Sequence, residues 1–263
     1  MEQTTSISHK ENTERIADLL LSIGVLLLSS GSNSRRMNVN ISRIANAWNC
    51  KIELFSSFTG IMVSLKDKEN SNLVTKFKRV AHHGVHYGIV SQISVLSWRV
   101  KDEQLSFEEV ERELEIISKM PHRPAGQIYF GIGIACASLC MLMHGDYKNA
   151  LVAFVASCAG LYFRRLLAGL KFNVLICIVP ASFVTSLIAG MDVLYHFGKT
   201  PESTLATSVL YLIPGVPLLN AIMDMIEGHI PTAMARGLYA ACILLGIAIG
   251  MILSMMLIGF SNY

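Results

Sequence analysis

Charged residues are scarce in this sequence, and few of them lie in its second half. Lys, Arg, Asp and Glu make up 16% of the 263 residues, against about 25% in an average soluble domain. Only 11 of these 41 residues follow Pro124. The uneven distribution predicts an N-terminal domain of residues 1–123, long enough for one compact soluble domain, and a second domain of residues 124–263 that is too apolar to be soluble.

The sequence also lacks long basic runs and closely spaced cysteine pairs. Its formal net charge is only +3, which argues against a nucleic-acid partner. None of the six cysteines forms a C-x-x-C pair, and five of them lie in apolar stretches. We therefore interpret them as small buried apolar residues rather than as a disulfide framework or a metal site, and the sequence predicts no cofactor.

A cleavable targeting segment is not expected at the N-terminus. Residues 19–28 are mostly apolar and are followed by small residues, as in a signal peptide, but the residues before them carry a net negative charge. Signal peptides require a positive segment there. The apolar positions also recur at helical spacing up to Gly31. We expect an amphipathic core helix that ends near this glycine.

The rest of the N-terminal domain mixes helical and strand-like patterns. Ser32, Asn33 and Ser34 offer caps for a second helix, and Ser106-x-x-Glu109 is typical of a capping box at the start of a later one. An apolar helical pattern also runs through residues 89–100. Strand-like runs lie at residues 51–57, 61–66 and 75–81. These elements predict an α+β domain.

No catalytic constellation appears in this domain. His82, His83 and His86 form the one cluster of metal-like composition, but no cysteine or acidic residue lies in short range to complete a ligand set. No serine lies in a nucleophile-elbow pattern either. We therefore predict a regulatory, assembly or gating module rather than an enzyme.

Five uncharged apolar segments follow Pro124. A helix needs about 20 residues to cross the hydrocarbon core, so three of them are long enough and the first two need flanking residues. The segments are residues 127–143, 149–163, 172–191, 204–223 and 237–260. The predicted fold is a multi-span α-helical membrane protein with five transmembrane helices and an N-terminal α+β cytosolic domain.

The positive charges of the connecting loops predict the orientation. Arg123, Arg164, Arg165, Lys171 and Arg236 fall on one side of the membrane, and only Lys148 and Lys199 fall on the other. The positive-inside rule then places the N-terminal domain in the cytosol and Tyr263 outside, in a multi-pass protein of the cell inner (plasma) membrane.

The fourth apolar segment contains a predicted helix break. Two prolines and a glycine within four residues cannot continue an α-helix without loss of backbone hydrogen bonds. Broken helices form substrate sites in transporters, because freed amides and half-helix ends meet the ligand within the membrane. We therefore predict a substrate-binding role for Pro214, Gly215, Val216, Pro217 and Asn220.

Acidic residues follow the break on one helix face. Asn220, Asp224 and Glu227 stand at i, i+4 and i+7. Burial disfavours the charged form of a carboxylate, so Asp224 and Glu227 are the predicted proton-coupling residues. The alternative is a kinked helix whose Asp224 marks the boundary between lipid and water. For Asp192, at the end of the third segment, we favour an interfacial position.

At these motifs the sequence resembles the threonine/serine exporter family over nearly its whole length. The resemblance is most specific from Ile213 to Asp224 and continues through Glu227, Gly228, His229 and Arg236. Further matches are Tyr162-x-Arg164-Arg165 and Gly31-x-x-x-Arg35. Many relatives have a glutamate where this chain has Asn38.

The resemblance implies ion-driven export of threonine, serine or a related small acid. Full-length relatives resemble two membrane halves in one chain, whereas this chain resembles the split branch, in which a second small membrane protein completes the transporter. One such pair is associated with succinate export, so an amino acid and a dicarboxylate both remain possible substrates. A homo-oligomer is the other possible assembly.

Two functions of other classes also remain open. One is a membrane-anchored hydrolase that uses the cytosolic domain, although the sequence shows no nucleophile–base pair for it. The other is a regulatory or structural membrane subunit without a substrate of its own. The coupling ion and the stoichiometry are not determined by the sequence.

Overall fold

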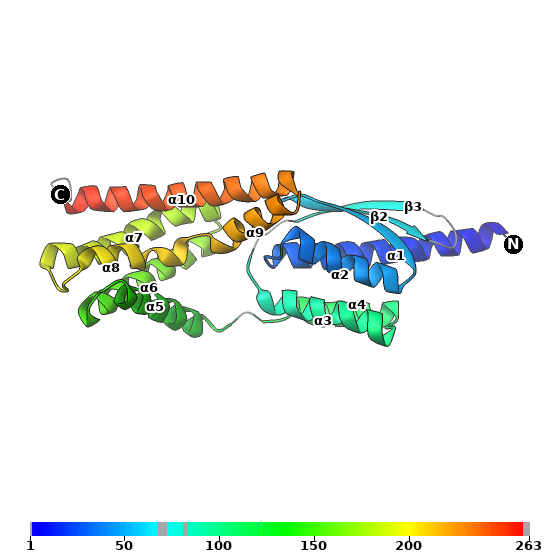
Figure 1. The fold of residues 1–263 in the computed structure, drawn as a ribbon, viewed down its shortest axis with the longest axis horizontal. Coiled ribbons are helices and arrows are strands. Elements are labelled where there is room, and N and C mark those ends of the chain that lie inside the picture. The colour runs from blue at the N-terminus through cyan, green and yellow to red at the C-terminus, as the bar shows by residue number, and fades with distance from the viewer. Residues whose placement is uncertain (1, 68–72, 81–83, 122, 260–263) are drawn as a thin grey trace. The chain divides into compact units, whose positions relative to one another are not determined.

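The computed structural model describes residues 2–67, 73–80, 84–121 and 123–259. The chain divides into two compact units (Figure 1). The first comprises residues Met1–His122 together with Val216–Gly237, and the second comprises Arg123–Gly215 with Leu238–Tyr263. The first boundary falls where the charge content of the sequence changes. The assignment of Val216–Gly237 to the first unit differs from a division at residue 123 alone, and the contacts below explain it.

The first unit is built around a three-stranded antiparallel sheet. Strands β1 (Cys50–Ser56), β2 (Gly60–Asp67) and β3 (Leu73–Arg79) lie in the order β1-β2-β3. In the central strand Ile61, Val63 and Leu65 alternate with more exposed residues and are fully buried. A strand with one apolar face must bury that face against another layer. Here the layer is α1 (Glu2–Ser29), which lies along the sheet in Figure 1.

Helix α1 supplies much of the core of this unit. Leu20, Ile23 and Leu27 are fully buried and cluster with residues of α2 (Ser34–Ala47) and α3 (Tyr87–Glu103). Burying each such side chain contributes roughly 1.5–3 kcal/mol. The prediction that residues 19–28 form a core helix is therefore confirmed.

The helix ends of this unit follow the predicted capping pattern. Asn33 caps α2 by accepting a hydrogen bond from the amide of Arg36 at 2.8 Å. Ser106 and Glu109 form both halves of a capping box at the start of α4 (Phe107–Ser118). The backbone and hydroxyl of Ser106 donate to the Glu109 carboxylate and lower its pKa. The sequence thus predicts both helix starts correctly.

All regular elements that the structure describes in the second unit are helices. It contains α5 (Ala125–Leu142), α6 (Tyr147–Gly169), α7 (Val174–Tyr195), α8 (Pro201–Ser208), a short 3-10 turn η1 (Leu210–Leu212) and most of α10 (Ile230–Ile258). Large apolar side chains such as Leu142, Leu245 and Met256 are more than 60% exposed. Exposed apolar surface on this scale is typical of helices that face lipid.

Four of these helices are long and apolar enough to cross a membrane, namely α5, α6, α7 and α10. A fifth span exists only if residues Pro201–Leu212 and the bent continuation α9 (Gly215–Ile226) form one broken span. Two predicted boundaries move. Helix α6 continues past Arg164 and Arg165 to Gly169, and α10 begins before Arg236, because neither arginine site contains a helix-breaking residue.

Helices α7 and α10 approach each other closely at Gly250. A Cβ atom there would lie 2.7 Å from the Cβ of Ser182 and in contact with the carbonyl of Val179. The hydroxyl of Ser182 also donates to the carbonyl of Ile247 at 2.8 Å. Small residues permit such close contact between membrane helices. The Gly246-x-x-x-Gly250 motif is thus an internal packing seam.

The predicted break in the fourth segment is short. The 3-10 turn η1 ends at Leu212, and α9 begins at Gly215, whose amide donates back to the carbonyl of Ile213 at 2.9 Å. Only Ile213 and Pro214 are outside both helices. Pro217 lies in the first turn of α9, where the missing amide of a proline costs little.

Candidate functional site

The polar face of α9 contacts the corner between α1 and α2, which comprises residues 31–34. The side-chain amide of Asn220 donates to the carbonyl of Gly31 at 2.9 Å. One turn later, Asp224 accepts a hydrogen bond from the backbone amide of Ser34 at 2.9 Å. Asn220 and Asp224 therefore share one face, as their i, i+4 spacing predicts.

Asp224 is the centre of this contact. Its side chain is fully buried, and its Oδ2 lies 3.3 Å from Nη1 of Arg236, which is only 6% exposed. Nη2 of Arg236 also donates to the carbonyl of Ser32 at 3.1 Å. The amide of Ser34 belongs to the first turn of α2, where a negative charge is favourable. Removing one partner of such a buried ion pair costs about 3–5 kcal/mol.

Glu227 completes the acidic face but is less well satisfied. Its nearest cation is Arg35, with Nη1 and Oε1 3.6 Å apart, and the Arg35 side chain is 70% exposed. Within the described ranges neither carboxylate oxygen of Glu227 accepts a hydrogen bond, although both are buried. A buried polar atom without a hydrogen-bond partner is costly.

A tight turn links this face to α10. Gly228 has a φ of +81°, a conformation that favours glycine. The next residue, His229, donates its amide to the carbonyl of Asp224 at 2.8 Å. Its Nε2 lies 3.5 Å from Nδ2 of Asn38.

The remaining predicted substrate residues contribute backbone and packing rather than polar side chains. Pro214 forms the break, while Gly215, Val216 and Pro217 make the first turn of α9. The side chain of Val216 packs beside Gly31. The first turn of a helix leaves backbone amides free, and these attract anions. Their role in substrate binding stays a prediction.

The second unit contains a buried carboxylate of its own. Asp192 lies near the end of α7, as predicted, but it is fully buried rather than exposed at an interface. Its Oδ2 accepts hydrogen bonds from Nδ2 of Asn149 and Oγ1 of Thr204, both at 2.6 Å, and its Oδ1 accepts from the amide of Gly198 at 3.0 Å. These three donors lie on three other segments, so Asp192 holds one end of this unit together.

No cluster of three His, Cys, Asp or Glu residues suited to a metal exists in the described part of the chain. His82 and His83, which suggested such a cluster, lie outside the described residues. His86 accepts a hydrogen bond from the amide of Ile89 at 3.2 Å and caps α3. This contact gives His86 a structural role.

Comparison with known proteins identifies the family. The model of the threonine/serine exporter family, ThrE, matches residues 18–258. The chain belongs to this family. No solved structure matches the chain. The match covers both compact units and every residue of the Asp224 contact.

Characterised relatives carry two kinds of name. The chain is 28% identical to the "Probable succinate transporter subunit YjjP" of Klebsiella aerogenes and 26% identical to the protein of that name in Escherichia coli. These alignments cover 97% and 96% of this chain and 98% of each relative. A "Probable threonine/serine exporter" of Mycobacterium tuberculosis is 23% identical over 93% of this chain, but the alignment covers only 46% of that relative.

Proposed function

We propose that the protein is a subunit of a secondary-active, proton-coupled exporter of small amino acids, such as threonine or serine, or of small carboxylic acids. The observation that carries this proposal is the buried Asp224–Arg236 pair, which lies ten residues after the helix break at Pro214. An ionisable pair beside a broken membrane segment is the usual arrangement of a coupled transport site. Membership of an exporter family supports the same class rather than an enzyme.

In this proposal, protonation of Asp224 changes the contacts that hold α9. As a carboxylate, Asp224 holds both Arg236 and the amide of Ser34. Protonation of Asp224 removes the charge that the ion pair with Arg236 requires and weakens the hydrogen bond from Ser34, which loosens α9 from the corner. Glu227, which lies beside the exposed Arg35, is the carboxylate through which a proton reaches the cluster from solvent in this proposal. A proton thereby changes the position of the helix that begins at Gly215.

The substrate is proposed to bind at the break. The amides that follow Pro214 form the positive end of α9, which suits a carboxylate. Every substrate class named above carries one. Val216, Pro217 and Asn220 line the same first turns of the helix. Movement of α9 on protonation of Asp224 then alters the substrate site directly.

We further propose that a second membrane protein, or a second copy of this chain, completes the transporter. Two relatives are named as subunits, and the mycobacterial relative is about twice as long as the part that this chain matches. In the proposed arrangement the protein lies in the cell inner membrane, with the N-terminal domain in the cytosol. No cofactor or nucleic acid takes part.

Metabolite efflux tests this function. Cells that lack the protein should retain threonine, serine or a small carboxylic acid, and overexpression together with its genomic neighbour should restore release. Overexpression of a Pro214→Ala/Pro217→Ala double variant should restore less, because the continuous helix no longer presents free amides. Equal release in the cells that lack the protein and in both overexpression strains would remove the exporter assignment.

Labelling of introduced cysteines tests the orientation. A cysteine at position 106 should react only from the cytosolic side, and one at position 261, which lies outside the described residues, only from the other side. Reaction of both from one side would exclude an odd number of spans.

A further inference from the structure

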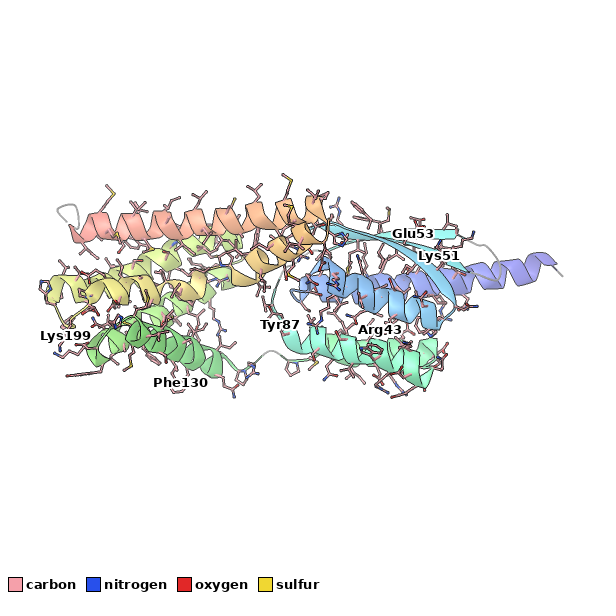
Figure 2. The ribbon with its side chains drawn as sticks, in the orientation of Figure 1. Arg43, Lys51, Glu53, Tyr87, Phe130 and Lys199 are labelled. Atoms are coloured by element: carbon pink, nitrogen blue, oxygen red, sulfur yellow. The ribbon has the colours of Figure 1, made fainter. Side chains whose placement is uncertain are left out.

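The N-terminal unit has an open pocket of about 370 Å³ that is rich in arginine. Arg35, Arg36 and Arg43 of α2 line it, with Ser94 and Trp98 of α3 opposite. Arg43 is labelled in Figure 2. Glu227 is the one carboxylate among the lining residues. The lining thus carries two more positive than negative charges.

Two of these arginines have only neutral partners. Nε and Nη2 of Arg36 both donate to the hydroxyl of Ser94, at 3.3 and 3.2 Å. Nη1 of Arg43 donates to the hydroxyl of Ser97 at 2.6 Å and to Oδ1 of Asn40 at 3.2 Å. Among the described residues no carboxylate lies within ion-pair distance of either one. Two permanent positive charges therefore face the pocket without a counter-ion.

The arginines are also held in place before any ligand arrives. The guanidinium carbon of Arg43 lies 3.8 Å from the centre of the Trp98 ring, and Nζ of Lys101 lies 5.3 Å from the same ring. Stacking on an aromatic ring leaves the guanidinium edge available for a bidentate contact with an acidic group. A fixed donor loses less conformational entropy on binding.

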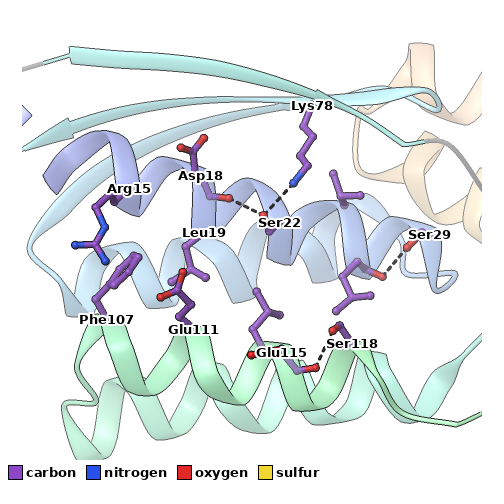
Figure 3. Close-up of a pocket in the computed structure, with 13 residues that line it drawn as sticks. Arg15, Asp18, Leu19, Ser22, Ser29, Lys78, Phe107, Glu111, Glu115 and Ser118 are labelled. Carbon is purple, nitrogen blue, oxygen red and sulfur yellow. Dashed lines mark hydrogen bonds between the residues drawn. The ribbon is translucent and has the colours of Figure 1, made fainter. Parts of the chain in front are cut away.

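A second pocket of the same unit shows that this charge pattern is specific. It has a volume of about 530 Å³ and lies between α1 and α4 (Figure 3). Arg15 stacks on Phe107 there, with its guanidinium carbon 4.7 Å from the ring centre. However, Asp18, Glu111 and Glu115 share the lining with Arg15 and Lys78. Its negative charges exceed its positive ones, so of these two pockets the α2–α3 pocket is the one that suits an anion.

We propose that the α2–α3 pocket binds a small dianion, such as a dicarboxylate or a phosphate. The two guanidinium groups can each donate hydrogen bonds to a pair of acidic oxygen atoms of such a ligand. A zwitterionic amino acid is disfavoured, because its ammonium group meets uncompensated positive charge. Binding of the dianion does not depend on the proposed function. Only its consequence, control of transport by the dianion, rests on that function.

Arg35 links the pocket to transport. Its guanidinium lines the pocket and is also the nearest cation to Glu227. A dianion in the pocket attracts Arg35 and so weakens the ion pair with Glu227. Occupancy of the pocket is thereby linked to a proposed proton-coupling residue, and the site acts as a cytosolic sensor or capture site for acids.

Isothermal titration calorimetry on the purified full-length protein in detergent tests this site. Succinate, inorganic phosphate and threonine are titrated separately into the parent protein and into Arg36→Gln, Arg43→Gln and Arg15→Gln. We expect succinate or phosphate to bind, with at least a tenfold loss of affinity in the Arg36 and Arg43 variants and no change in the Arg15 control. The two dianions distinguish a carboxylate ligand from a phosphate ligand.

The proposal is overturned if neither dianion binds, if threonine binds as tightly, or if the three variants behave alike. Melting temperatures of the variants show whether each is folded, and Ser94→Ala offers a milder variant that releases Arg36 without removing it. Asp224 does not line the pocket, so the dianion affinities of the Arg36 and Arg43 variants are measured whether or not Asp224→Asn retains gradient-driven transport. A failure of the transport proposal at Asp224 is therefore distinguishable from a failure of this site.

Discussion

Substitution of Arg236 by methionine keeps most of the side-chain length and removes its charge. Asp224 would then retain the hydrogen bond from Ser34 but lose its cation inside a fully buried site. An unpaired buried charge is costly because no water replaces the lost partner. We expect the first unit to lose about 3–5 kcal/mol of stability.

A matched control exists in the same cluster. Arg35→Met breaks the pair with Glu227, in which Arg35 is 70% exposed. Exposed ion pairs contribute only about 0–1 kcal/mol. Arg35→Met should therefore have a small effect, although both variants remove one arginine from one carboxylate.

Thermal unfolding of the purified variants in detergent measures the difference. Arg236→Met should lower the melting temperature several times more than Arg35→Met. The Asp224→Asn/Arg236→Met double variant should regain part of the loss, because no buried charge is left unpaired. Equal melting temperatures for the two single variants would refute the view that the Asp224–Arg236 pair is the buried centre of the cluster.

Three further predictions follow from other contacts. Asp192→Ala leaves two buried side-chain donors and the part-buried amide of Gly198 without this acceptor. Each buried donor costs about 1–3 kcal/mol, so the yield of folded protein should fall far more than in Asp146→Ala. Gly250→Val should separate α7 from α10. The control Gly259→Ala adds a Cβ atom that meets no neighbour and strains only the backbone, which has a positive φ there. Cysteine cross-linking between the two helices should fall in the first variant and not in the second. The pKa of Glu109 is lowered in the folded protein, so its contribution to stability is present at neutral pH and is lost as the pH falls through that folded-state pKa. The melting-temperature difference between the parent and Glu109→Gln should therefore vanish in acid.

The sequence predicts the elements of the N-terminal domain well, because local chemistry determines them. The capping box at Ser106 and Glu109 and the alternation of Ile61, Val63 and Leu65 are each contained within a few residues. The apolar run 19–28 is equally informative, since a helix so apolar within a charged domain must be buried. Patterns of this kind require no knowledge of distant contacts.

The contact between Asp224 and the corner could not be predicted in the same way. Helical spacing places Asn220 and Asp224 on one face but does not name what that face meets. Ser34 and Asp224 are 190 residues apart. The sequence suggested Gly31 as a helix end, Arg236 as a loop charge and Arg35 as part of the family pattern. The structure brings all three to the same cluster. Membership of Val216–Gly237 in the first unit follows from this contact.

The burial of Asp192 was missed for a related reason. An acid near the end of an apolar segment is usually at the membrane surface, and Asp192 does lie near the end of α7. Its partners Asn149 and Thr204 lie near the starts of two other helices. Each is an unremarkable polar residue in sequence. Only the packing of three helices shows that they converge on one carboxylate.

The central claim is that protonation of Asp224 drives transport, and the most direct measurement is substrate flux through Asp224→Asn. This variant keeps the size of the side chain and an acceptor for the amide of Ser34, but it cannot titrate. The protein, together with the proposed partner membrane protein, is placed in vesicles with and without a proton gradient over a range of pH. We predict that Asp224→Asn exchanges substrate across the membrane but no longer exports it in response to the gradient. Gradient-driven export at the parent rate across that pH range would contradict the account.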